Sequence, residues 1–188
     1  MFITHNYTER SNTFQLGLQN KTNVPPWNDP ISRWELGAQP LWINFSDPTI
    51  THLKDNVQWD IDPTFYHMGV VNQNTVDAAD QWIYLLITST NFPSFAPGKT
   101  FIPAAHPIHL HGHDFAIVAQ SAKPYWDSFV VIKQDNPPRR DVALLPANGY
   151  LIIAFKSDNP GSWLMHCHIA WHASAGLGMC QPNQFTKK

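Results

Sequence analysis

Charged side chains are scarce in this sequence: Asp, Glu, Lys and Arg together make up 14% of the 188 residues, and the formal net charge is −2. Because there is no basic excess and no basic stripe, we expect no nucleic-acid-binding surface. No apolar run approaches the roughly eighteen residues that span a bilayer, so we expect no membrane helix. The N-terminus does not resemble a signal peptide. We therefore expect that a signal was removed or that the chain is a fragment.

Apolar and aromatic residues are plentiful by contrast: 43% of the residues are hydrophobic, with 11 Phe and 8 Trp, and 16 prolines interrupt the chain. This composition is too apolar for a disordered chain and is typical of short strands joined by loops. Strand patterns occur at residues 41–45, 81–88, 115–119, 129–132, 142–145, 150–155 and 163–165. Turn sequences rich in Pro, Asn and Gly separate them. These features predict an all-β fold, a Greek-key β-sandwich or barrel, with one short helix near residues 169–175.

The first part of the chain has a different character. Residues 1–38 are polar and irregular, and we interpret them as an arm or linker; an edge strand of the main domain is the alternative. Residues 39–188 then form one domain, which is long enough for one well-filled core. Within this domain, residues 81–88 are apolar on both faces, which predicts a strand that lies between two layers.

Cysteine is rare, with Cys167 and Cys180 as the two in the chain. A pair at this spacing is compatible with a disulfide in a secreted protein. Cys167, however, lies between two histidines, so we expect a metal-binding thiolate there and a Cys180 that is unpaired or bonded outside the chain. Glycosylation sequons begin at Asn6, Asn20 and Asn44 and give weak support for a secreted, extracellular protein.

Seven of the ten histidines lie in two short segments, residues 106–113 and 166–172, and the second segment also contains Cys167. A lone histidine is more often a packing or surface residue, but such a dense cluster with a thiolate is typical of copper or zinc ligands. Side chains alternate between the two faces of a strand. His109 and His111 are therefore expected on one face, and His166 and His168 on the face opposite Cys167.

The Cys167 side needs ligands from elsewhere. His172 lies one helical turn after His168 and can turn back toward the thiol, and His106 can complete that side. Cys167 with His106 and His172 gives the trigonal set of blue copper electron-transfer sites, whereas zinc prefers a fourth strong ligand. Leu177 is the candidate for the axial position, with Met179 near but out of step. An axial leucine that does not coordinate predicts a high reduction potential.

The two histidine segments resemble the third and fourth copper-binding motifs of the multicopper oxidases, and most of all those of fungal laccases. Residues 135–142 and 158–165 are also similar to segments of the laccase C-terminal domain, which implies a cupredoxin-like fold over residues 40–180. The resemblance implies type 1 copper at His106, Cys167 and His172, type 2 copper at His109, and a type 3 pair at His111, His166 and His168. It gives no ligand role to His113, which we interpret as a packing or supporting residue. Arg139, Arg140 and Asp141 are expected to form structural ion pairs.

Laccases build their oxygen-reducing cluster from eight histidines, and this chain has no His-Xaa-His motif before residue 106 to supply the other four. By the same resemblance, we expect the C-terminal extension of ascomycete laccases to be missing. The resemblance implies one-electron oxidation of phenols or aromatic amines, as in lignin oxidation. It also implies that electrons enter and pass through Cys167, His172, His166 and His168, and that they reduce O2 to water where a partner chain or oligomer completes the cluster. One alternative is a single-domain copper protein that transfers electrons without reducing O2, and another is a structural or hydrolytic zinc domain.

Overall fold

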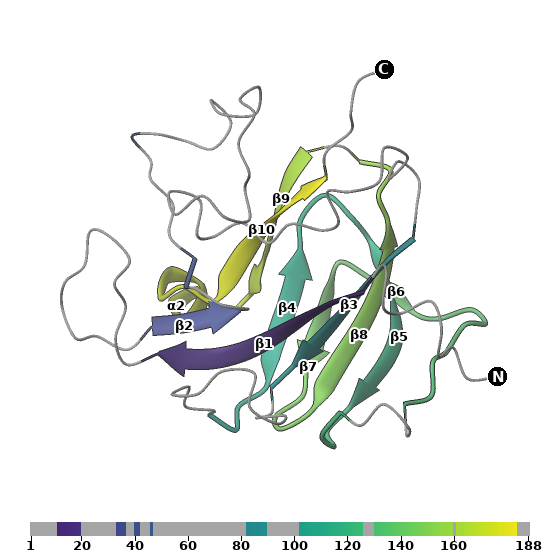
Figure 1. Ribbon diagram of the computed structural model, residues 1–188, viewed down its shortest axis with the longest axis horizontal. Helices are drawn as coiled ribbons and strands as arrows, with labels where there is room; N and C mark the ends of the chain where they lie inside the picture. Colours follow the sequence, from purple (N-terminus) through teal and green to yellow (C-terminus); the bar gives the residue numbers. More distant parts are fainter. Residues whose placement is uncertain are drawn as a thin grey trace.

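The computed structural model describes residues 11–19, 33–36, 40–41, 46, 82–89, 102–125, 130–159 and 161–183. These residues form two facing β-sheets (Figure 1). The larger sheet, in the order β2-β1-β3-β8-β5-β6, contains β1 (Ser11–Gln19), β2 (Arg33–Leu36), β3 (Trp82–Thr88), β5 (Phe115–Ser121), β6 (Arg139–Arg140) and β8 (Tyr150–Lys156). The smaller sheet, in the order β10-β9-β4-β7, contains β4 (His106–Leu110), β7 (Val142–Leu145), β9 (Gly161–Cys167) and β10 (Gly178–Asn183). Helix α2 (Ala170–Ser174) follows β9.

The prediction of an all-β Greek-key sandwich is confirmed. Neighbouring strands in both sheets are mostly not consecutive in the chain, and the strand pairs of the described residues are antiparallel except for β1 with β3. The short helix after the His-Cys-His segment is also present, one residue shorter at each end than residues 169–175.

The core lies between the two sheets. Its largest cluster combines buried side chains of β3 and β8 from one sheet with those of β4, β7 and β9 from the other. A second apolar cluster covers the outer face of the larger sheet around Leu86, Val118 and Ile152, with Tyr125 and Ile132 packed on it. Strand β3 therefore has apolar neighbours on both faces, as its two-sided hydrophobic pattern predicts.

Residues 1–38 contribute two strands to the larger sheet. Strand β1 pairs in parallel with β3 over Ser11–Gln15, and β2 pairs antiparallel with β1 at the sheet edge. These two stretches are therefore not an irregular arm: β2 is an edge strand, as in the alternative interpretation, and β1 lies between β2 and β3. The physical reason is that the free edge of β3 offers backbone partners to an extended segment.

Several strand boundaries differ from those expected. The predicted strand at 129–132 is wrong for Val130–Ile132, which lie outside the strands of the structure. The next residue, Lys133, donates its backbone N–H to the Val118 carbonyl oxygen of β5 at 2.7 Å. The short β6 pairs with the start of β5 instead. Leu41 lies outside the strands, and the rest of the predicted strand at 41–45 lies outside the described residues. Strand β10, which contains glycine and proline, was not predicted.

Candidate metal centre

The pairing of β4 with β9 brings the two histidine segments together. Ile108 lies opposite Cys167, and His109 lies opposite His166. The first pair is completely buried in the core, whereas the two histidines are partly exposed on the outer face of the smaller sheet. The alternation along both strands therefore separates the thiol from its neighbouring imidazoles, as the sequence predicts.

On the inner side, the thiol of Cys167 meets two imidazoles. The Sγ atom lies 3.7 Å from Nδ1 of His106 and 3.7 Å from Nδ1 of His172. These three residues, here called the thiolate trio, place their ligand atoms within 4.8 Å of one another. His106 comes from the start of β4, Cys167 from the end of β9, and His172 from helix α2.

The thiolate trio has the dimensions of a metal site. Metal–nitrogen bonds of about 2.1 Å and metal–sulfur bonds of about 2.3 Å place nitrogen and sulfur ligands roughly 3.6–3.8 Å apart at tetrahedral to trigonal angles. The observed 3.7 Å falls in this range, and it is long for a hydrogen bond. The donor set and its geometry therefore fit a copper or zinc ion.

Leu177 lies next to the thiolate trio. Its side chain is completely buried, its carbonyl oxygen accepts a hydrogen bond from the backbone of Cys167 at 3.0 Å, and its N–H donates to the carbonyl of His172 at 2.9 Å. These two bonds hold the Leu177 backbone between two members of the trio. Met179 lies two residues on in β10 and belongs to the buried core cluster.

Burial sets the protonation of the thiolate trio. Desolvation lowers the pKa of His106 to about 4, with the nearby charge of His172 as a second cause. Desolvation also lowers the pKa of His172 and raises that of the Cys167 thiol. At neutral pH without metal, the two imidazoles are therefore neutral and ready to bind, and the thiol keeps its proton.

On the opposite side of β9, four imidazoles gather on the outer face of the smaller sheet. These outer histidines are His109, His111, His166 and His168. Their rings lie 4.7–5.7 Å apart in the contacting pairs, and the Nε2 atoms of His111 and His166 face each other at 3.2 Å. Among the described residues, only the thiolate trio brings three ligand atoms together as closely as 4.8 Å.

Backbone carbonyls orient two of the outer histidines. The Nδ1 of His109 donates to the carbonyl oxygen of Asp141 at 2.6 Å, and the Nδ1 of His166 donates to that of Cys167 at 2.8 Å. A carbonyl can only accept, so each ring carries its proton on Nδ1 and has its lone pair on Nε2. The Nε2 lone pair of His166 faces Nε2 of His111. Desolvation lowers the pKa of His111 and of His166, and the neighbouring imidazoles lower both further.

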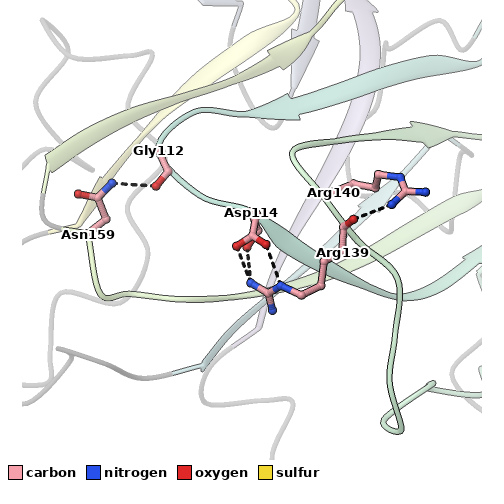
Figure 2. A network of polar contacts seen from close by, with 5 residues as sticks. All are labelled: Gly112, Asp114, Arg139, Arg140 and Asn159. Carbon is pink, nitrogen blue, oxygen red and sulfur yellow. Dashed lines mark hydrogen bonds and ion pairs between the residues drawn. The ribbon is translucent and has the colours of Figure 1, made fainter.

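The turn that carries His111 is fixed from two sides (Figure 2). On one side, Asn159 Nδ2 donates to the carbonyl of Gly112 at 2.8 Å. On the other, Arg139 forms an ion pair with Asp114 at 2.6 Å, as expected for a structural arginine. Gly112 has φ +72°, and a Cβ there would lie 2.4 Å from the Trp163 ring, so this turn requires glycine.

The remaining residues singled out from the sequence either have packing or surface contacts or lie outside the described residues. His113 faces Phe155 and Trp163 with ring distances of 4.8 and 5.9 Å, which is a packing position. Arg140 donates to the carbonyl of Arg139 at 2.8 Å. Asn6, Asn20 and Asn44 lie outside the described residues, as does the side chain of Cys180. In the described part of the chain, no helix is long and apolar enough to cross a bilayer.

Sequence reasoning missed the residues that surround the ligands. Trp34 contacts His172, and Asn159 contacts the turn that carries His111, each from a distant part of the chain. Asp114 follows His113 directly and links this turn to Arg139. Nothing in the local pattern identifies Trp34, since it lies 72 positions before His106. Asp114 is a polar residue that follows directly on His111-Gly112-His113, and this position is the sequence signal that could have identified it.

Comparison with known proteins agrees with this architecture. The multicopper oxidase family model matches residues 42–183. A laccase of Arthroderma benhamiae is 47% identical over 91% of this chain and 25% of its own length, and laccase-2 of Botryotinia fuckeliana is 46% identical over 78% and 23%. The crystal structure of the laccase from Botrytis aclada has a TM-score of 0.67 and 38% identity, over 95% of this chain and 29% of that one. The chain thus spans about a quarter of the length of these relatives. It belongs to the multicopper oxidase family, as a domain of the fungal laccase type.

Proposed function

We propose that this chain is the copper-binding domain of a laccase-type oxidase, in which the thiolate trio receives single electrons from phenols or aromatic amines. The observation that carries this proposal is the convergence of two Nδ1 atoms, each 3.7 Å from the same buried thiol. Two imidazoles and one thiolate are the ligand set of blue copper sites. Copper supplies the one-electron redox chemistry when it is bound.

In this proposal His106, Cys167 and His172 would hold a type 1 copper, and Leu177 would lie beside it without coordinating. A buried leucine has no donor atom to stabilise the cupric state, so a high potential is expected. His106 is completely buried, whereas His172 is partly exposed on its short helix. His172 is therefore the side of the trio that faces an approaching substrate.

In this proposal electrons pass from the thiolate trio to the outer histidines along the backbone at the end of β9. Cys167 faces the core, and its direct neighbours His166 and His168 belong to the outer histidines, so the two sides are one peptide bond apart along the backbone. We assign His109 to type 2 copper and His111, His166 and His168 to the type 3 pair. The two carbonyl hydrogen bonds leave the lone pairs of His109 and His166 on Nε2, which supports ligand roles for these rings.

The outer histidines supply half of the eight donors of a laccase cluster, so further histidines must come from another domain or a partner chain for O2 to be reduced to water. The open surface around them supports such a contact. His111 and His168 are exposed, and so are Val142 and Leu144 on the neighbouring β7, with Val142 directly opposite His109. Exposed apolar side chains next to an incomplete set of metal ligands are typical of a surface that contacts another domain or chain.

The second candidate function is a copper protein that transfers electrons without reducing O2. It is favoured by the fact that, within the described residues, only the thiolate trio forms a group of three close ligand atoms.

The three sequons support a secreted, extracellular glycoprotein. The laccases among the relatives support a substrate of the lignin-type phenols.

The test is to load the purified chain with Cu²⁺, count the bound metal, record the absorption and electron paramagnetic resonance spectra, and follow oxygen consumption with a simple phenol. We expect one firmly bound copper with an intense thiolate-to-copper band, partial occupancy at the outer histidines, and slow oxygen consumption. A spectrum without the thiolate band would remove the type 1 assignment. Rapid turnover by a monomer with a full set of coppers would remove the need for a partner.

A further inference from the structure

Trp34 lies against both imidazoles of the thiolate trio, although it comes from β2 at the edge of the other sheet. The centroid of its ring is 4.6 Å from that of His172 at an interplanar angle of 39°, and 5.1 Å from that of His106 at 65°. The two imidazoles are themselves 4.9 Å apart. The three rings therefore form one cluster in which the indole contacts each ligand ring.

The backbone fixes Trp34 to the end of helix α2. Its N–H donates to the carbonyl oxygen of Ala175 at 3.0 Å. The next residue, Gly176, has φ +106°, and a Cβ at this position would lie 2.7 Å from the carbonyl oxygen of Trp34. Two residues along β2, Leu36 is buried in the core between the sheets. The indole thus has a fixed position relative to the helix that carries His172.

Helix α2 is too weak to orient His172 without such support. It has five residues, none of them buried, and no side-chain hydrogen bond caps its N-terminus. A helix of this length is not stable by itself in water, so outside contacts hold it in place. His106 differs, because it sits on a paired strand and is completely buried. Of the two imidazoles, His172 is the one whose ring depends on a neighbour.

We propose that Trp34 is a positioning residue for the copper site: its indole packs on both imidazoles, keeps that of His172 turned with Nδ1 toward Cys167, and excludes water from the space beside them. The proposal rests on the proposed function, in which the thiolate trio binds copper. An offset or edge-to-face aromatic contact changes an equilibrium constant by about 2- to 10-fold. Loss of two such contacts is therefore expected to weaken metal binding by an order of magnitude and to change the ligand geometry.

The experiment uses the full chain loaded with Co²⁺, which does not oxidise the thiol, and in parallel with Cu²⁺. The variants are Trp34→Leu, which removes the aromatic ring, and Trp34→Phe, which keeps a smaller one. Trp82→Leu is the matched control, because Trp82 is a partly exposed tryptophan on β3 of the larger sheet. The readouts are the thiolate-to-metal absorption band, the electron paramagnetic resonance spectrum of the copper form, and the Co²⁺ affinity from chelator competition.

We expect Trp34→Leu to bind Co²⁺ about 10-fold more weakly and to shift the absorption band. Trp34→Phe should lose only two- to threefold, and Trp82→Leu should match the wild type in both readouts. If Trp34→Leu does not fold, the phenylalanine variant still decides the question. Unchanged affinity and band in the folded Trp34 variants would overturn the role of Trp34 alone. A wild-type chain without any thiolate-to-metal band would instead overturn the copper site, and this proposal with it.

Discussion

Arg139 binds both carboxylate oxygens of Asp114, with Nε 2.8 Å from Oδ2 and Nη2 2.6 Å from Oδ1. Nη2 also donates to the Asp114 carbonyl at 2.9 Å, so one guanidinium fixes the side chain and the backbone of the same residue. Asp114 follows the turn that carries His111, and Asn159 holds Gly112 on the other side of that turn (Figure 2). The pair lies on the surface, and its consequence is therefore the position of the histidine turn more than the stability of the fold.

Asp114→Asn is expected to lower the free energy of unfolding by less than about 1 kcal/mol, because the ion pair is exposed. Metal binding at the outer histidines should weaken, while the thiolate band of the trio stays. Arg139 lowers the pKa of Asp114 below its ordinary value of 3.8, so the pair stabilises the fold above that pH and its contribution is lost as pH falls through the lowered pKa. Urea titrations at several pH values, with Asp141→Asn as the control, measure the free energy of unfolding and its pH dependence. Equal losses from both variants would contradict the prediction.

Cys167→Ser is expected to remove the thiolate-to-copper absorption and leave the protein folded. The hydroxyl is nearly isosteric with the thiol, but it does not ionise near neutral pH and is a poor ligand for soft metals. Cys167 is completely buried, so a modest loss of stability is expected as well. Absorption spectroscopy and circular dichroism of the copper-loaded variant test both parts. A band that survives in the serine variant would show that another group is the ligand.

Leu177→Met is expected to lower the reduction potential of the trio's copper. A thioether at the axial position donates to the metal and favours the oxidised form. The shift should be on the order of 59 mV, which is a tenfold change in a one-electron equilibrium constant. A redox titration that is monitored by absorption measures the reduction potential. Met179→Leu is the control, since Met179 belongs to the same buried cluster but lies further along β10. An unchanged potential would mean that the Leu177 side chain does not face the metal.

Metal binding to the trio should release about one proton per ion at neutral pH. Burial raises the pKa of the Cys167 thiol above 9.0, so the thiol must lose its proton when it binds. Burial lowers the pKa of His106 to about 4 and lowers that of His172 below 6.5, so both imidazoles are neutral at pH 7 and bind a metal without losing a proton. Calorimetry in two buffers that differ in ionisation enthalpy gives the proton count. Release of two or three protons near pH 6.5 would contradict these protonation states.

Local patterns predicted the parts of the site that depend on alternation along a strand. The opposite directions of Cys167 and His166 follow from their adjacent positions in β9, and the short helix brings His172 back to the thiol. The register between β4 and β9 and the position of Trp34 depend on packing between distant segments, for which the sequence holds no local signal. Strand β1 had a weak signal, since Phe14, Leu16 and Leu18 alternate with polar residues or glycine. Strand β10 had none, because Gly178 and Pro182 are poor strand formers.

His111→Ala and His113→Ala separate ligand binding from packing at two neighbouring imidazoles. His111 is exposed, and its Nε2 atom lies 3.2 Å from that of His166, so its loss should weaken metal binding at the outer histidines with little effect on stability. His113 packs on Phe155 and Trp163, so its loss should lower the free energy of unfolding by about 1 kcal/mol or more and leave the metal count unchanged. In both variants the thiolate trio should keep its absorption band, because it lies on the opposite face of β9. Metal analysis after gel filtration and urea unfolding test the two effects separately. If His113→Ala lost metal and His111→Ala kept it, the assignment of ligand and packing roles in this segment would be reversed.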